Sequence, residues 1–373
     1  MRDAMGIIYT GDNNVSLKEI TRSRSMAAVP FGGRYRIIDF ILSNMVNSGI
    51  QNVGIITQNN YHSLMDHLDS GKQWDLDRKR DGLFILPPYV SRDNTGWYKG
   101  KVDALHNIMS YIRRSNQKYV VISGSHMVCN LTYDSALEFH KKNNADITVL
   151  YKEEKNVTSE ELSRSILIRT RDDNRIWDME VTPSSPKSNM VSMEMYIMEK
   201  SLLEYLVEEC VARGQNDFIK DILIKKMEVL NIYGYPYTGY LANIDTIQSY
   251  FKYNMELLDP MNRYELFFRA GNIYTKVKDE VPAKYCKNAK SQNSMVADGC
   301  IIEGEIEDSI LFRGVRVAEG AIVKNSIIMQ NTKIEENAIL ENVILDKEVI
   351  IRRGKRLIGQ ECYPIVIGKK AVI

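Results

Sequence analysis

Residues 315–345 read VRVAEGAIVKNSIIMQNTKIEENAILENVIL, and aliphatic side chains recur in this stretch every five or six positions. An amphipathic helix would repeat about every 3.6 residues, and a hairpin would alternate over one short run only. A period close to six predicts a left-handed parallel β-helix, in which triangular coils stack their aliphatic corners on one another. A plain antiparallel sheet is the alternative. The recurring positions are Val317, Ile322, Ile328, Ile334 and Leu340.

Glycine and asparagine residues separate the aliphatic positions of this repeat, which begins near residue 298. Many hexapeptide proteins are acyltransferases that use a histidine base, but all five histidines of this chain precede the repeat. We therefore expect the repeat to serve as a scaffold or an oligomer contact. The separating residues are Gly299, Gly304, Gly314, Gly320, Asn325, Asn331 and Asn337.

Upstream of the repeat, short apolar runs alternate with amphipathic segments. Runs such as 119–123 (YVVIS) predict buried strands, and segments such as 39–47 predict helices. This alternation is typical of βαβ units and predicts a mainly parallel sheet covered by helices. Strands are expected at 5–9, 52–57, 119–123, 147–151, 165–170 and 191–198, and helices at 39–47, 61–68, 102–114, 134–142, 201–213 and 240–258.

Length and composition fit an ordinary water-soluble protein of two domains. The chain has 373 residues, a net charge of +1 and 26% charged residues, so its overall charge favours neither nucleic acid nor a membrane surface. Its five cysteines are scattered, which argues against a disulfide framework or a zinc site. No signal peptide and no membrane-spanning run are recognised. We expect a cytoplasmic protein.

One stretch of the first domain carries a distinctive motif. Residues 31–44 read FGGRYRIIDFILSN, and 47–50 follow as NSGI. This motif closely resembles bacterial ADP-glucose pyrophosphorylase (glucose-1-phosphate adenylyltransferase). The resemblance covers essentially the whole chain, including the change to a β-helix. Further matches lie at 54–58, 97–100, 103–104, Asp217, Phe218, Lys220, Asp221, Tyr250, Lys252 and Asn254.

The resemblance implies a Rossmann-like nucleotidyltransferase domain over 1–259 with a mixed, mainly parallel sheet. A linker at 260–294 and the left-handed β-helix at 295–373 would follow. That family transfers AMP from ATP to glucose 1-phosphate and releases pyrophosphate. The reaction needs a glycine-rich turn that approaches the triphosphate. It also needs cations for the phosphates and two aspartates that hold Mg²⁺.

The phosphate-binding loop of this chain departs from the family pattern Gly-Gly-x-Gly-Thr-Arg-Leu. The matching segment, 11–17, reads GDNNVSL and keeps Gly11. Asp12 would place a negative charge where the triphosphate lies, and Asn14 adds a Cβ where the backbone must approach closely. Ser16 replaces an arginine that could grip phosphate. All three changes oppose triphosphate binding.

Four further positions have lost the charged group that the family carries. Met26 stands at a lysine position in the segment after the loop. Ser125 and Asn243 stand at the two metal-binding aspartates, and Thr182 falls near the sugar-phosphate lysine. Because Mg²⁺ holds poorly to neutral oxygens alone, no metal is expected to bind here. No cofactor is expected, and Mg²⁺ would be needed only if the chain were active.

Other family positions are retained. Arg24, Arg34 and Arg36 match a region that contributes to the site for anionic sugar-phosphate effectors, and ordinary ion pairs are the alternative. Gly100 and Asp103 match the surroundings of the family's active site. So do Lys220 and Asp221. Without the loop, we expect Asp103, Lys220 and Asp221 to be kept for packing of the fold. Gly11 is a further retained residue of the site region.

The preferred hypothesis is a catalytically inactive, regulatory subunit of glucose-1-phosphate adenylyltransferase in glycogen biosynthesis. Such a subunit would join a catalytic subunit in a hetero-oligomer such as a tetramer, or form a homo-oligomer alone, and would respond to a sugar-phosphate effector. One alternative is a weakly active or altered nucleotidyltransferase that recruits metal through Asp12, Asp103 or Asp245. Another is a sugar-nucleotide binding module that acts without a partner. No nucleic acid or membrane partner is expected.

Overall fold

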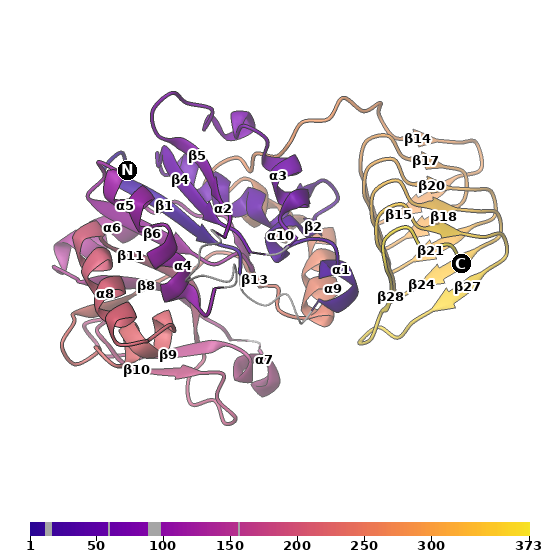
Figure 1. Ribbon diagram of the computed structural model, residues 1–373. Coiled ribbons are helices and arrows are strands. Elements are labelled where there is room, and N and C mark those ends of the chain that lie inside the picture. The colour runs from indigo at the N-terminus through magenta and orange to yellow at the C-terminus, as the bar shows by residue number, and fades with distance from the viewer. Residues whose placement is uncertain (12–16, 59, 89–97, 156) are drawn as a thin grey trace.

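The computed structural model describes residues 1–11, 17–58, 60–88, 98–155 and 157–373. It consists of an α/β domain followed by a stack of short parallel strands, which lie side by side (Figure 1). The first domain is built on a mixed sheet of nine strands. Its strands are β1 (Ala4–Tyr9), β4 (Asn52–Ile56), β5 (Gly82–Leu86), β6 (Tyr119–Ser123), β8 (Ile147–Glu153), β9 (Ile166–Thr170), β10 (Ile176–Val181), β11 (Met190–Glu199) and β12 (Ile232–Pro236).

The strand order of this sheet is β10-β9-β11-β6-β1-β4-β5, with β8 pairing both β11 and β12. Strands β6, β1, β4 and β5 run parallel, whereas β11 is antiparallel to β6, β8 and β9. The predicted Rossmann-like α/β fold with a mixed sheet is confirmed. The carboxyl ends of β1 and β6 point to the same edge, where Gly11 and Gly124 follow.

Helices cover both faces of the sheet because successive strand side chains alternate between them. Ala4 and Ile8 of β1 pack on one side, whereas Met5, Ile7 and Tyr9 pack on the other. The helices are α1 (Lys18–Thr21), α2 (Ile37–Asn47), α3 (His62–Leu68), α4 (Lys101–Asn107), α5 (Met109–Arg114), α6 (Asp134–Lys142), α7 (Ser159–Ser163), α8 (Lys200–Ala212), α9 (Ile247–Met255) and α10 (Pro260–Phe267).

Two helix predictions need correction. The single helix expected at 102–114 is two helices, α4 and α5, because the backbone leaves the helical region at Ile108 (φ −99°, ψ 11°). The helix expected at 240–258 begins only after Thr246, whose hydroxyl caps it by accepting from the Ser249 backbone N–H. The preceding residues form β13 (Leu241–Asn243), which pairs antiparallel with β7 (Met127–Cys129).

The C-terminal stack consists of three five-stranded parallel sheets, one for each side of a triangular coil. The predicted β-helix is confirmed, and the antiparallel alternative is wrong. Asn325, Asn331 and Asn337 all adopt positive φ, which explains their recurrence at the turns, since asparagine tolerates the left-handed region better than most residues. The strands are β14 (Lys284–Tyr285), β15 (Lys290–Gln292), β16 (Met295–Val296), β17 (Ile301–Ile302), β18 (Glu305–Glu307), β19 (Ile310–Leu311), β20 (Arg316–Val317), β21 (Ile322–Lys324), β22 (Ile327–Ile328), β23 (Lys333–Ile334), β24 (Ile339–Glu341), β25 (Val343–Leu345), β26 (Ile350–Ile351), β27 (Arg356–Ile358) and β28 (Ile365–Ile367).

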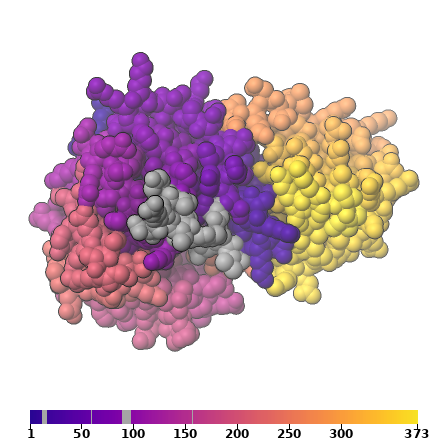
Figure 2. Space-filling view, viewed as in Figure 1, coloured from indigo at the N-terminus to yellow at the C-terminus, as the bar shows by residue number. Residues whose placement is uncertain are grey.

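The segment expected as a linker, 260–294, contains regular structure. It includes α10 and the first strands of the coil, since β14 and β15 pair with β17 and β18. The β-helix also shares a hydrophobic cluster with the first domain, in which Phe312 and Met329 pack with Phe31 and Phe40. The two domains touch (Figure 2), and apolar side chains of both contribute to their contact.

Candidate functional site

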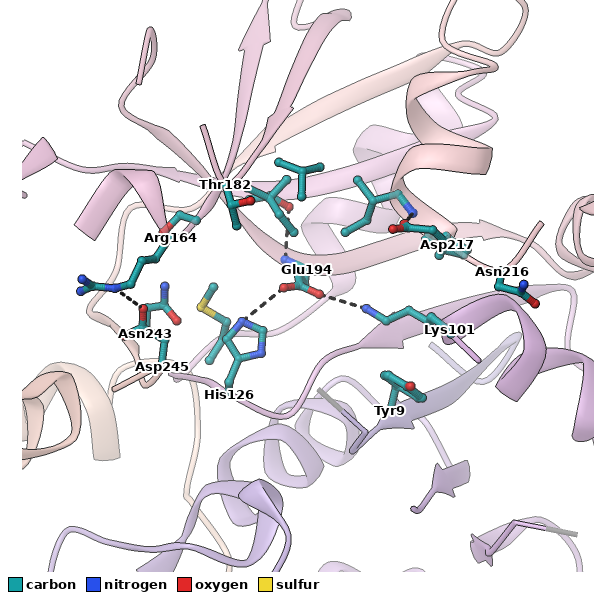
Figure 3. Close-up of a pocket in the computed structure, with 18 of the residues that line it drawn as sticks. Tyr9, Lys101, His126, Arg164, Thr182, Glu194, Asn216, Asp217, Asn243 and Asp245 are labelled. Atoms are coloured by element: carbon teal, nitrogen blue, oxygen red, sulfur yellow. Dashed lines mark hydrogen bonds and ion pairs between the residues drawn. The ribbon is translucent and has the colours of Figure 1, made fainter. Parts of the chain in front are cut away.

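A cavity of about 420 Å³ opens at the carboxyl ends of β1 and β6. Its wall is drawn from segments that are distant in the sequence (Figure 3). The N-terminus of α4 supplies Gly100 and Lys101, the segment after β6 supplies His126, and β11 supplies Glu194. The remaining lining residues include Tyr9, Lys99, Arg164, Thr182, Asn216, Asp217, Asn243 and Asp245.

Glu194 lines this cavity and contacts both Lys101 and His126 (Figure 3). The Lys101 ammonium donates to its Oε2 at 2.9 Å, and the His126 Nε2 lies 3.4 Å from its Oε1. Burial opposes ionisation of this carboxyl, but the charges of Lys101 and His126 outweigh it and lower the pKa of Glu194. The Lys101 ammonium also lies 5.5 Å from the centroid of the Tyr9 ring.

The backbone of β11 bends to bring this carboxylate into the cavity. The register against β8 shifts between Ser192 and Met195, so the strand bulges here. Glu194 has φ +52°, in the left-handed region that a side chain other than that of glycine, asparagine or aspartate rarely adopts. The Gly124 N–H donates to the Glu194 carbonyl at 3.2 Å, which ties the bulge to the end of β6.

The two positions that match metal-binding aspartates lie on neighbouring segments. Asn243 is paired with Met127 across β13 and β7, and the Ile244 N–H donates to the His126 carbonyl, one residue after Ser125. The Ser125 Oγ and the Asn243 Oδ1 are buried, and neither has a hydrogen-bond partner among the described residues. The two positions that were matched by sequence thus lie in one region of the fold, and both side chains are neutral.

A magnesium ion does not fit the described residues of this region. The Asp245 carboxylate, which could have replaced a lost aspartate, accepts from Arg164 Nε at 2.9 Å. The Glu194 carboxylate is held by Lys101. Within the described ranges, no group of three or more histidine, cysteine, aspartate or glutamate residues is arranged to hold a metal ion. Mg²⁺ prefers carboxylate and phosphate oxygens. Ser125 and Asn243 offer only a hydroxyl and an amide oxygen.

The other positions that depart from the family pattern do not all lie at the cavity. Thr182 lines the cavity at the end of β10, with φ +46° and its N–H donating to the Ser165 carbonyl. Met26 instead packs in the hydrophobic core of the first domain, away from the cavity lining. The residues Asp12, Asn14 and Ser16 lie outside the described part of the chain.

Close packing or side-chain hydrogen bonds explain four of the five retained positions. A Cβ on Gly11 would lie 2.6 Å from the Tyr9 ring, and one on Gly100 would lie 2.3 Å from the Asn216 carbonyl oxygen. Asp103 accepts from the Lys99 N–H at 2.9 Å. Asp221 accepts from the N–H groups of the 216–217 turn and from the Lys225 ammonium at 2.6 Å. Lys220 is exposed on the π-helical turn Phe218–Ile224.

A second, smaller cleft of about 60 Å³ lies where the β-helix meets the first domain. Both Arg34 and Arg36 line it, whereas Arg24 is buried beside it and paired with Asp346 at 2.9 Å. The other charged lining residues are Asp66, Lys276, Lys278, Arg313 and Lys347.

Positive charge is concentrated in this interdomain cleft. Burial lowers the pKa of Lys347 to about 7, and the nearby Arg36 and Arg24 guanidinium groups contribute in the same direction. Burial likewise lowers the pKa of Arg36 to about 10. Cations that depress one another's pKa in this way favour a bound anion, since its charge would relieve their repulsion.

Sequence reasoning missed the charged centre of the large cavity. Neither Lys101 nor Glu194 was singled out, because a lysine at a helix start and a glutamate in a strand are ordinary surface residues. One signal was available at Glu194, which is the only charged residue in the apolar run 191–198 (VSMEMYIM). A charge at that place in a buried strand requires a buried partner.

Comparison with known proteins agrees with this architecture. Residues 5–260 match the family model described as nucleotidyl transferase, and residues 281–362 match the GlmU-like C-terminal hexapeptide model. The chain is 38% identical over 326 residues to a glucose-1-phosphate adenylyltransferase of Clostridium novyi, covering 86% of this chain and 84% of that protein. It is 39% identical over 369 residues to the glycogen biosynthesis protein GlgD of Bacillus subtilis, covering 99% and 96%. In the described residues, no helix is long and apolar enough to cross a membrane.

Proposed function

This chain belongs to the nucleotidyl transferase family that includes glucose-1-phosphate adenylyltransferase and GlgD of glycogen biosynthesis, and from that premise we propose that it is a regulatory subunit without catalytic activity of its own. It would act with a catalytic glucose-1-phosphate adenylyltransferase subunit in a hetero-oligomer, such as a tetramer. By itself it would form a homo-oligomer at most. We assign it to the cytoplasm, where its five free cysteines would stay reduced.

The observation that carries the proposal is the neutral pair Ser125 and Asn243. The Ser125 Oγ and the Asn243 Oδ1 are buried and have no hydrogen-bond partner among the described residues. These are the positions that match the family's metal-binding aspartates by resemblance. The nearby carboxylates of Glu194 and Asp245 are each committed to a cation. A single charge-stabilising group is worth roughly 10³- to 10⁵-fold in phosphoryl transfer. The loss of both metal-binding carboxylates therefore supports our proposal that any activity of this chain alone is too slow to be functional.

The interdomain cleft supports the regulatory part of the proposal. Its cations include Arg34 and Arg36 of the first domain and Arg313 and Lys347 of the β-helix. An anionic effector such as a sugar phosphate, bound between them, would contact both domains at once. It would therefore favour one arrangement of the domains, which is the requirement for coupling to a neighbouring subunit.

The test is pyrophosphate release from ATP and glucose 1-phosphate with Mg²⁺, first with this chain alone and then with a catalytic relative added. We expect no turnover above background by the chain alone and a change in kcat or KM of the catalytic subunit in the mixture. Robust turnover by the chain alone would favour an altered enzyme. Separate elution and unchanged kinetics would favour a module that acts without a partner.

A further inference from the structure

Glu194 combines two unfavourable features in one residue. Its φ of +52° places a glutamate in a backbone region that is unfavourable for a residue with a Cβ. Its carboxylate is also largely withdrawn from water, with the side chain only 12% exposed. Strain of this kind persists where the surrounding structure holds it in place, and it concentrates at functional sites.

The carboxylate of Glu194 lies between the Lys101 ammonium and the His126 ring. Lys101 donates to one oxygen and the His126 ring faces the other. The remaining guanidinium in the wall, that of Arg164, is bound to Asp245 at 2.9 Å and to Glu160 at 3.0 Å. The Lys101 and Arg164 cations of the lining are thus already matched by carboxylates of the chain itself, whereas Lys99 in the same wall is exposed.

We propose that Glu194 is a specificity-determining residue, which acts as a built-in counter-ion and excludes phosphorylated ligands from this cavity. A phosphate group that entered would have to displace the carboxylate from Lys101 and would then face its uncompensated charge. A ligand without charge meets no such barrier. This exclusion goes beyond the regulatory role, because it is a property of the isolated chain and needs no partner.

A substitution of Glu194 alone should remove this exclusion of phosphorylated ligands. Glu194→Gln keeps the size of the side chain and removes its charge. Glu194→Gly removes the side chain and also suits the left-handed backbone. Either change removes the carboxylate that lies against the Lys101 ammonium and the His126 ring. Both variants should therefore gain affinity for an anion, and the glycine variant keeps the test valid if glutamine disturbs folding.

The experiment is calorimetric titration of the purified full chain with glucose 1-phosphate and, as the uncharged probe, glucose. We expect both variants to bind glucose 1-phosphate at least about ten-fold more tightly than the unmodified chain, with glucose binding unchanged. The gain should disappear in the double variant Lys101→Gln/Glu194→Gln. Glu199→Gln is the matched control, since Glu199 is also on β11 and pairs with Lys118 at 2.9 Å outside the cavity.

Two results would overturn the inference. One is equal affinity of the unmodified chain and both folded Glu194 variants for glucose 1-phosphate. The other is a gain that survives in the double variant, since the anion would then bind elsewhere. Binding at the interdomain cleft contributes equally to all variants and cancels in the comparison. Failure of this test would leave the regulatory proposal intact, because that proposal is judged by the kinetics of the catalytic subunit.

Discussion

The Arg24 guanidinium lies 2.9 Å from the Asp346 carboxylate, and both side chains are almost fully buried, at 2% and 1% exposed. The pair joins the first domain to the β-helix across 322 positions of sequence. Arg24 was expected either to contribute to an effector site or to form an ordinary ion pair. Its Nη2 makes this ion pair, while its buried Nη1 has no hydrogen-bond partner among the described residues. Its position beside Lys347 and Arg36 lets it act on the interdomain cleft through charge.

Asp346→Asn should destabilise the protein, because it leaves the buried Arg24 charge without its counter-ion. Breaking a buried ion pair in this way typically lowers the free energy of unfolding by about 3–5 kcal/mol. Denaturant unfolding of the variant measures the loss. The matched control is Glu307→Gln, which breaks the exposed pair of Glu307 and Lys324 at 2.7 Å and should change stability far less, because water screens this pair. Equal losses for the two variants would contradict this account.

Anion binding in the interdomain cleft should weaken as the pH rises from 6 to 8. The pKa of Lys347 is lowered to about 7, so this side chain loses its charge in that range. Sulfate is a suitable probe, because its own charge stays constant there. The pKa of His67, which also lines the cleft, is lowered by burial below its ordinary value, so its titration lies at lower pH. In Lys347→Met, sulfate affinity should be lower and nearly independent of pH over this range.

The lowered pKa of Lys347 also predicts how the stability of the protein depends on pH. Stability should rise with pH, whereas anion binding should weaken. Lys347 binds its proton less tightly in the folded state than in the unfolded chain, whose lysine pKa is about 10.4. Between pH 7 and 10 the unfolded state therefore binds more protons, and stability rises with pH relative to Lys347→Met. Thermal unfolding of both proteins across this range measures the difference. A difference that stays constant with pH would show that the folded pKa of Lys347 is not lowered.

The architecture was predictable because each part of it repeats. Aliphatic positions such as Ile322 and Ile328 recur at the period of a coil, and runs such as 119–123 are too apolar and too short for anything but buried strands. The strand β13 was missed because Leu241–Asn243 is only three residues long and is stabilised by pairing with β7, a contact between distant segments. No local pattern carries that information.

The candidate site was predictable only where a motif could be matched position by position. The neutral residues Ser125 and Asn243 were found in this way, and the structure places them on neighbouring segments of the fold. Glu194 was missed because its importance depends on the β-bulge that turns it toward Lys101. A bulge reflects the register between two strands, and register is set by tertiary packing.

Gly100→Ala should destabilise the protein although it adds a single methyl group. A Cβ on Gly100 would lie 2.3 Å from the backbone carbonyl oxygen of Asn216, which accepts from the Val102 N–H and so cannot move freely. Overpacking of this kind typically costs about 1–3 kcal/mol of the free energy of unfolding. Gly368→Ala is the control, since a Cβ there has nothing within 4 Å. A loss no greater than that of the control would contradict the close approach.

Restoring both carboxylates should restore metal binding. The double variant Ser125→Asp/Asn243→Asp places two acidic side chains on the adjacent segments that follow β6 and form β13. Without metal, their mutual repulsion should lower stability. Added Mg²⁺ should then raise the unfolding temperature of the variant, since a ligand at 100 times its Kd stabilises the folded state by about 2.7 kcal/mol. The unmodified chain should not respond to Mg²⁺, and NaCl at the same ionic strength separates metal binding from general salt effects. A Mg²⁺ response of the unmodified chain equal to that of the variant would show that the described residues hold a metal after all, and the proposal of a site without metal would fail.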